Sequence, residues 1–418
     1  MSPMFRSLSN RNYRLWVGGS LVSNIGTWMQ RVAQDWLVLT VLTTNSGTAV
    51  GFTTGLQFLP ILILGPYAGV LADRFRKRLI LIWTQTAMAL CGLIVGLLVV
   101  AGAAQLWHIY AAALGLGIAS AIDGPTRQAY VSELVDREDV ANAVSLNSAS
   151  FNTARLTGPA LAGVLIAWIG SGPVFLLSAA SFAAVLLSLW RIRPNECAPF
   201  SPTFRRRRQI SEGLNYVRQR PDLVLILWMV GFIGAFGMNF PITNALMSTA
   251  EFRVGPGEFG LLGSLMAVGT LGGALLAARR SGPRLLHLIG GAVALGLCSF
   301  VACLTPTFWL YAAMMIPVGL ASITFVNSCN TSIQLSTDGE FRGRVLAFYL
   351  AISQGGTALG APLMGWIGTE FGARWSIGIG GAVVMITGVV ALIVVSGRSP
   401  LPFKSQVVNA LSLRRATR

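Results

Sequence analysis

The chain has 418 residues, of which 54% are hydrophobic and only 11% are charged. A soluble globular domain carries roughly 25% charged residues, so this chain cannot cover a soluble surface and lipid must be its main solvent. The net charge of +16 would indicate nucleic-acid binding in a soluble protein. In a membrane protein, basic residues that flank apolar segments are a requirement of topology, and no nucleic-acid partner is expected.

Apolar segments long enough to cross a bilayer recur along the whole chain. About twenty residues span the ~30 Å of hydrocarbon. We therefore predict an all-α integral membrane protein with twelve transmembrane helices in two six-helix halves. The predicted spans are residues 14–42, 49–71, 79–102, 107–128, 143–169, 173–191, 223–248, 258–278, 285–304, 308–330, 345–369 and 375–396.

The distribution of lysine and arginine predicts the orientation. With both termini in the cytoplasm, 27 of the 31 basic residues fall in cytoplasmic segments, and only Arg253 and Arg374 fall on the other side. The other two, Arg31 and Arg155, lie within spans. This asymmetry satisfies the positive-inside rule. We expect a multi-pass protein of a bacterial-type inner membrane with both termini cytoplasmic.

A polar stretch near the middle divides the chain. Ile210, Leu214 and Val217 recur there at helical spacing, which favours an amphipathic helix lying on the anionic leaflet. The alternative is a plain basic tether. The expected parts are an N-terminal half at 1–191, a linker at 192–222, a C-terminal half at 223–396 and a cytoplasmic tail at 397–418.

An internal repeat supports this division. A shift of 202 residues aligns Gly158-Pro159-Ala-Leu-Ala-Gly163 with Gly360-Ala-Pro362-Leu-Met-Gly365. Two copies of a six-helix unit are a known transporter plan, in which substrate binds near the midplane between the halves.

The loop after the second span is rich in charge. It reads Gly69-Val-Leu-Ala-Asp73-Arg74-Phe-Arg76-Lys77-Arg78. Such a cluster can join helix ends in one conformation and release them in another. It resembles the signature loop of the major facilitator superfamily at Gly69, Asp73, Arg74, Lys77 and Arg78, although Arg76 replaces the usual second glycine. The resemblance implies a conformational-switch loop.

Further segments resemble one branch of that superfamily, which includes the enterobactin exporter and macrolide-type efflux proteins. They are Trp28-Met-Gln30-Arg31-Val-Ala-Gln34-Asp35-Trp36, Asp123-Gly124-Pro125-Thr-Arg127 and Arg155-Leu-Thr-Gly158-Pro159. In the superfamily, a glycine-proline motif matching Gly158, Pro159 and Gly163 is associated with proton-driven exporters. The fourth-helix arginine of drug–proton antiporters would fall near Ala111 and is absent. Arg31 or Arg155 could replace it.

Asp35 is the only acidic residue deep within a predicted span. A charge in mid-bilayer costs several kcal/mol or needs a partner, so it marks a functional site by default. Arg31 lies four residues earlier, on the same helical face. Asp35 and Arg31 are therefore the candidates for proton coupling. The alternative is a static ion pair that holds the first helix to its neighbours.

Arg155 is the second cation within the membrane. It could attract an anionic or catecholate-like substrate, or it could pair with Asp123 or Asp35. Other polar residues within the spans are candidates to line a cavity, and each could equally form an interhelical hydrogen bond. The full set is Asn24, Gln34, Asp123, Arg127, Asn147, Asn152, Arg155, Asn239, Asn244, Asn327 and Gln354.

The leading hypothesis is a secondary active, proton-driven exporter of small amphipathic molecules, such as siderophores or drugs, that works by alternating access. The alternative is a proton-coupled importer of a small metabolite on the same fold. The chain contains no G-x-x-x-x-G-K-[ST] motif, nucleophile–base pair or cofactor fingerprint. We therefore expect neither an ATP-driven pump nor an enzyme, with no cofactor and no metal. The expected partners are the bilayer, the substrate and protons, and the chain is expected to be a monomer.

Overall fold

A computed structural model describes residues 3–196, 209–278 and 285–397, and it contains helices but no strand in these ranges. The predicted tail and residues 197–208 of the predicted linker lie outside them. The N-terminal helices are η1 (Pro3–Ser9), α1 (Arg11–Leu37), η2 (Val38–Leu42), α2 (Gly47–Arg74), α3 (Lys77–Val100), α4 (Leu106–Val131), α5 (Val140–Ile169), α6 (Ser171–Arg191) and η3 (Pro194–Glu196).

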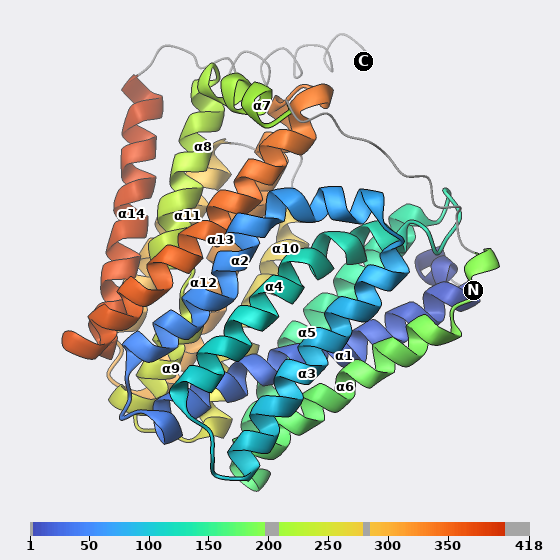
Figure 1. Cartoon of the computed structure of the whole chain (residues 1–418). Coiled ribbons are helices and arrows are strands. Elements are labelled where there is room, and N and C mark those ends of the chain that lie inside the picture. The colour runs from blue at the N-terminus through green and yellow to red at the C-terminus, as the bar shows by residue number, and fades with distance from the viewer. Residues whose placement is uncertain (1–2, 197–208, 279–284, 398–418) are drawn as a thin grey trace.

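The C-terminal part continues with a short helix and then the remaining spans (Figure 1). Its helices are α7 (Gln209–Arg218), α8 (Pro221–Phe232), η4 (Ile233–Gly237), α9 (Phe240–Leu246), η5 (Met247–Glu251), α10 (Pro256–Ala278), α11 (Leu285–Cys303), α12 (Phe308–Ser336), α13 (Gly339–Glu370) and α14 (Ala373–Gly397).

Each of the twelve predicted spans coincides, within a few residues, with one helix or one run of consecutive helices. Among the described residues, eight of these segments are long and apolar enough to cross a membrane by length and composition alone. The apolar part of α11 is shorter, at His287–Cys303. α1, α5 and α13 are long but contain more polar residues, as expected for helices that face other helices or water. The twelve-span architecture is consistent with these findings.

The seventh span is interrupted in the middle. α8 passes into the π-helical turn η4, the chain breaks at Asn239 (φ −90°, ψ 33°), and α9 begins at Phe240. Pro241 lies in the first turn of α9, where its missing N–H needs no partner. Interrupted helices of transporters commonly lie beside the substrate path.

The two ends of the bundle differ in what they hold. We call the end that holds α7 and the α2–α3 loop the linker side; it is at the top of Figure 1. We call the opposite end, with the η2–α2 and η5–α10 loops, the far side. Toward the linker side, α1, α3 and α6 slope away from α8 and α14 in Figure 1.

The two halves meet along two seams related by the internal repeat: α2 packs on α13, and α5 packs on α10. A Cβ added to Gly163 would lie 2.5 Å from the Pro256 carbonyl oxygen, and one added to Gly365 would lie 2.2 Å from that of Gly47. Gly163 and Gly365 are equivalent positions of the repeat. The duplicated glycine therefore lets backbones of the two halves touch at both seams.

The halves are joined by contacts at the far side and near the middle of the helices. At the far side, the Thr48 N–H donates a hydrogen bond to the Thr369 hydroxyl at 3.0 Å, and Trp36 of α1 stacks on Phe259 of α10 with ring centroids 6.0 Å apart. Near the middle of α5, the Ser264 hydroxyl donates to the Leu156 carbonyl at 2.8 Å. The first two contacts close the far side between the halves.

The linker helix α7 packs on the α12–α13 turn. The Tyr216 hydroxyl donates to the Asp338 carboxylate at 3.0 Å, and the Tyr216 ring stacks on Phe341 with centroids 4.5 Å apart. Just after α7, Arg220 donates two hydrogen bonds to Asp222, at 2.9 and 2.7 Å. The linker helix is thus fixed to the C-terminal half by specific contacts.

Only part of the apolar face predicted for α7 is buried against the rest of the protein. Val217 is buried, whereas Leu214 is 40% exposed. The side chain of Ile210 lies outside the described residues. Leu214 is therefore free to contact a membrane surface while Val217 holds the helix on α13.

Arg220→Ala should lower the free energy of unfolding by about 3 kcal/mol, because it leaves the buried Asp222 carboxylate without its partner. The measurement is thermal unfolding of the purified protein in detergent. Arg218→Ala is the matched control, since this exposed arginine lies two residues away and should change stability little. Equal effects of the two substitutions would contradict the role given to the Arg220–Asp222 pair.

Candidate functional site

Charged side chains of α1 and α5 gather around one tryptophan. The guanidinium carbon of Arg31 lies 5.0 Å from the ring centroid of Trp28, and that of Arg155 lies 5.9 Å from the same ring. Asp35 follows Arg31 by one turn and is buried. We call Trp28, Arg31, Asp35 and Arg155 the charge cluster.

The members of the charge cluster differ in depth. α1 and η2 together run from residue 11 to residue 42, so their midpoint is near residue 26. At a rise of 1.5 Å per residue, the Cα atom of Arg31 lies about 7 Å from that midpoint along the helix axis, and the Cα atom of Asp35 lies about 13 Å from it, both toward the far side. Arg155 lies in the middle of α5. Asp35 is thus the member nearest the closed far side.

Arg31 and Asp35 form no ion pair within 4 Å, and Asp35 has no hydrogen-bond partner in the described part of the chain. Helical side chains lean toward the N-terminus, so the long Arg31 side chain extends back over Trp28, away from Asp35. Its guanidinium also approaches Phe58 of α2, at 5.8 Å from the ring centroid.

Asp123, a possible partner of Arg155, is instead bonded to its own neighbours. Its carboxylate accepts hydrogen bonds from Thr84 at 2.8 Å and Gln85 at 2.7 Å, both on α3. It also forms an ion pair with Arg127 at 3.0 Å. Asp123 and Arg127 therefore join α3 to α4 on the linker side of the N-terminal half, and we leave them out of the proposed site.

A polar stripe on α5 leads from the linker side to Arg155. Ser145, Ser148 and Asn152 are exposed and share one helical face with Arg155, which is half-buried. Each of these three exposed side chains donates a hydrogen bond to the backbone carbonyl four residues earlier, at 2.9 Å. Their remaining polar atoms are better solvated by water than by hydrocarbon, so the stripe is a candidate lining of a water-filled path.

The remaining polar candidates are spread over both halves. Asn244 is buried and accepts a hydrogen bond from the Tyr311 hydroxyl at 2.7 Å, which joins α9 to α12. Gln34 and Asn239 are also buried, whereas Asn24, Asn147, Asn327 and Gln354 are half-buried.

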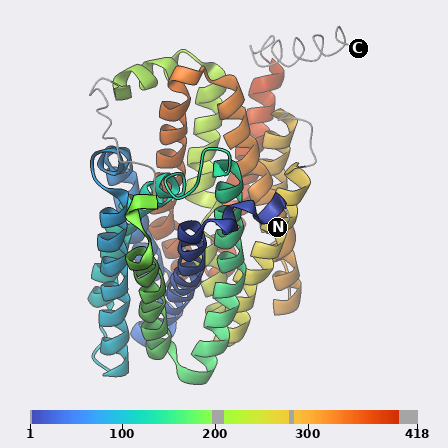
Figure 2. The same ribbon diagram turned by 90° about the vertical axis from the view of Figure 1, so that its right-hand side faces the viewer.

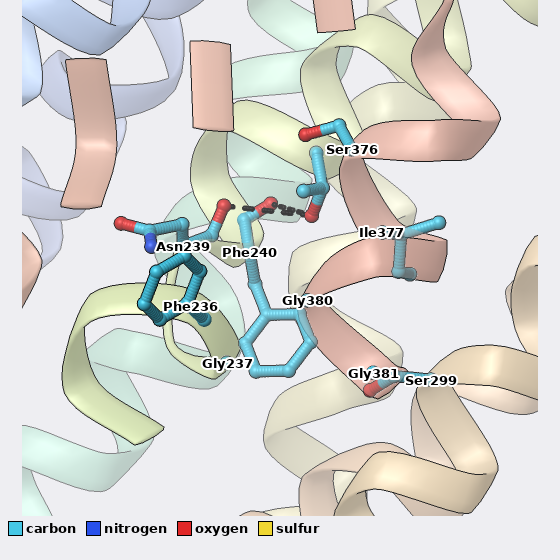
Figure 3. A pocket seen from close by; sticks show the side chains of 10 residues that line it. Phe236, Gly237, Asn239, Phe240, Ser299, Ser376, Ile377, Gly380 and Gly381 are labelled. Atoms are coloured by element: carbon cyan, nitrogen blue, oxygen red, sulfur yellow. Dashed lines mark hydrogen bonds between the residues drawn. The ribbon is translucent and has the colours of Figure 1, made fainter. Parts of the chain in front are cut away.

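A small cavity lies beside the break in the seventh span (Figure 3). Its volume is about 10 Å³, room for one water molecule at most. The Asn239 side-chain NH₂ lines it and donates to the Ala235 carbonyl, while the side-chain oxygen Oδ1 is buried without a hydrogen-bond partner among the described residues. Phe236, Phe240 and Ser376 form other parts of the wall. This cavity is too small for an organic substrate.

The predicted switch loop ties helix ends together within the N-terminal half. The Lys77 ammonium pairs with Glu133 just after α4, and Arg78 donates to the Trp190 carbonyl at 3.2 Å near the end of α6. Arg74 is exposed at the end of α2. The backbones of Gly69 and Asp73 form the last turns of α2, and the surroundings of these two residues lie outside the described part.

The glycine-proline motif of α5 lies between the charge cluster and a seam. A Cβ added to Gly158 would lie 2.5 Å from the Cβ of Trp28, and the Pro159 carbonyl approaches Gly260 of α10. Gly163 forms the α5–α10 contact described above. The motif therefore connects the position of Trp28 to the packing of the two halves.

Sequence reasoning missed several partners in these sites. Phe58, Thr84, Gln85 and Tyr311 are ordinary residues within apolar spans, and no spacing pattern marks them. The offset of 202 residues predicts the equivalence of the seams but not which side chains meet there.

Twelve spans in two repeat-related halves, with charged side chains inside one half, are the architecture of a membrane transporter of the major facilitator type. The chain matches the transmembrane secretion effector family of this superfamily over residues 2–405, and it belongs to that family. It is therefore a multi-pass membrane transporter and not an enzyme.

Characterised relatives include two siderophore transporters and a drug-efflux protein. The staphyloferrin A transporter of Staphylococcus aureus is 27% identical, with 83% of this chain and 87% of the relative covered. The enterobactin exporter of Shigella boydii is 26% identical, with 85% of both chains covered. Macrolide efflux protein A of Streptococcus pyogenes is 23% identical, with 90% of this chain and 94% of the relative covered.

Among solved structures, a bacterial homologue of the human lysosomal transporter Spinster, inward-facing and unoccupied, superimposes with a TM-score of 0.70. The two chains are 17% identical, and 94% of this chain and 96% of that one are covered. This similarity confirms the fold, an all-helical bundle in the described ranges that Figure 2 shows from the side.

Asp123→Asn should lower the free energy of unfolding by about 3 kcal/mol, because Arg127 would lose its partner in a nearly buried pair. Asp35→Asn should leave stability unchanged or raise it, because it removes a buried charge that has no direct ion pair. Thermal unfolding in detergent measures both. If Asp35→Asn proved as destabilising as Asp123→Asn, Asp35 would have to be regarded as structural.

Proposed function

We propose that this protein is a proton-driven exporter of small amphipathic molecules that works by alternating access. The observation that supports this most directly is the charge cluster: a buried carboxylate and two arginines, without a direct ion pair, on helices next to the seams between the halves. The charges of a purely structural site would be paired and hydrogen-bonded, as they are at Asp123.

The orientation follows from the basic residues. Among the described residues, the linker side holds the basic α2–α3 loop and Arg218 and Arg220 beside α7, whereas Arg253 and Arg374 lie toward the far side. We therefore assign the linker side to the cytoplasm of a bacterial-type inner membrane, with both termini there. The far-side contacts at Thr48–Thr369 and Trp36–Phe259 then close the periplasmic side. The structure corresponds to an inward-facing state.

Asp35 has the place that a coupling carboxylate requires. It lies near the periplasmic edge of the hydrocarbon, just inside the contact between Trp36 and Phe259. Opening of that contact would expose Asp35 to protons from the periplasm, and its closure would leave only the path past Arg31 toward the cytoplasm. An alternation of this kind lets a proton enter from one side and leave to the other.

The substrate class is taken from the relatives, which are named for staphyloferrin A, enterobactin and macrolides. A siderophore- or drug-like molecule would contact the charge cluster on one side. On the other it would meet half-buried uncharged groups such as Asn327 and Gln354 of the C-terminal half. A single chain supplies both halves, so we propose a monomer, and its excess basic charge serves topology and not nucleic-acid binding.

Asp35→Asn should abolish uncoupler-sensitive resistance to the compounds that the wild-type protein exports, because the coupling proton then has no binding site. The measurement is a susceptibility panel of siderophores and antibiotics in a host whose own pumps are deleted. Asp136→Asn, the same change at an exposed aspartate between α4 and α5, is the control and should retain the coupling. Full uncoupler-sensitive resistance in Asp35→Asn would show that another group couples the proton.

A disulfide across the periplasmic seam should stop transport. The Thr48 and Thr369 hydroxyl oxygens lie 3.3 Å apart, so cysteines at both positions can form a disulfide with small side-chain rotations. In a background without the five native cysteines, oxidation of the double variant should abolish efflux, and reduction should restore it. The single variant Thr48→Cys should be insensitive to oxidation. Full efflux by the cross-linked protein would contradict alternating access at this seam.

A further inference from the structure

The charge cluster is not electrically balanced. It holds the two positive charges of Arg31 and Arg155 and the one negative charge of Asp35. Asp123 is already paired with Arg127, and in the described helices of the C-terminal half charged residues occur only near helix ends. One positive charge within the membrane is thus left without a counterion, which costs several kcal/mol.

The two arginines retain free donors. The Nε of Arg31 is buried and has no hydrogen-bond partner in the described part of the chain, where Arg155 likewise has neither a hydrogen bond nor an ion pair. Contact with the Trp28 ring satisfies part of each guanidinium charge but none of its N–H groups. The planar fork of a guanidinium matches a carboxylate, which it can bind through two hydrogen bonds.

The surroundings of the two arginines suit an aromatic or amphipathic body. Phe58 lies against Arg31, and Phe151 packs edge-on against Trp28 with centroids 6.1 Å apart while remaining 46% exposed. The stripe of Ser148 and Asn152 reaches Arg155 from the linker side. A ligand with one charged end and one apolar face could therefore enter from the cytoplasm and place its charge between the arginines.

We propose that Arg31 and Arg155, whose guanidinium carbons lie 5.0 and 5.9 Å from the Trp28 ring centroid, form a binding subsite for the carboxylate of an organic anion, and that the exported molecules are amphipathic organic acids. This rests on the proposed function as an exporter. One carboxylate makes the cluster electrically neutral with Asp35 ionised, so that the loaded transporter moves no net charge of its own. An uncharged molecule of the same shape would leave the excess charge in place.

Binding of a matched pair of small probes tests the proposal on the purified full-length protein. Benzoate and benzamide have the same ring and similar size but differ in charge. Benzoate should raise the unfolding temperature above the value in sodium chloride of equal ionic strength, and benzamide should not. Arg155→Gln and Arg31→Gln should each weaken apparent benzoate affinity about tenfold, the loss expected for a charged hydrogen bond.

Further variants separate this subsite from a general charge effect. Arg155→Lys keeps the charge but loses the fork, so its affinity should be intermediate. Asp35→Asn should bind benzoate more tightly than wild type, because it increases the excess positive charge. Arg253→Gln, at an exposed arginine on the far side, is the matched control and should bind benzoate as wild type does.

Equal stabilisation by benzamide and benzoate, or unchanged benzoate binding in both glutamine variants, would overturn the proposal. If the glutamine variants fail to fold, the proposal would be overturned by Arg155→Lys and Asp35→Asn proteins that both bind benzoate with wild-type affinity. The measurement uses no proton gradient and is therefore independent of the proposed export. Specific benzoate binding without proton-driven efflux would contradict only the export, and efflux without benzoate binding would contradict only the subsite.

Discussion

Hydrocarbon cannot solvate a charge, and this constraint explains where the protein keeps its charged groups. Most basic residues lie at helix ends, and the buried Asp123 and Asp222 are held by arginine and hydrogen bonds. The charge cluster is different, because its three charges lie together without a direct ion pair. A site of this kind is stable only if water, a proton or a ligand completes it. The unusual electrostatics of α1 and α5 therefore connect the fold to transport.

The same two helices also join the halves. α5 contributes Gly158 to the packing of Trp28 and Gly163 to the seam with α10, and α1 contributes Trp36 to the contact with Phe259. We therefore propose that movement at the seam and occupancy of the charge cluster affect each other, as thermodynamic linkage requires of two coupled sites. The repeat supplies a second close approach between the halves at Gly365.

Much of this arrangement could be predicted from the sequence. The twelve spans follow from hydrophobic length, the equivalence of Gly163 and Gly365 from the 202-residue offset, and the importance of Asp35 from the cost of a mid-membrane charge. The break at Asn239 and the approach of Arg31 to Arg155 could not be predicted, because they depend on local backbone geometry and side-chain direction. The bonding of Asp123 to Thr84 and Gln85 depends on which helices pack together, and periodicity does not encode that. The packing of α7 on the α12–α13 turn through Tyr216 could not be predicted for the same reason, because it also depends on which helices pack together.

Transport in everted membrane vesicles tests proton-driven export most directly. The vesicles would contain the wild-type protein, and the accumulation of a labelled siderophore that carries a carboxylate would be followed after imposing a pH gradient, acidic inside. We predict accumulation inside the vesicles that begins with the gradient and collapses when an ionophore removes it. Accumulation that ignores the gradient, or that occurs only in right-side-out vesicles, would contradict proton-driven export.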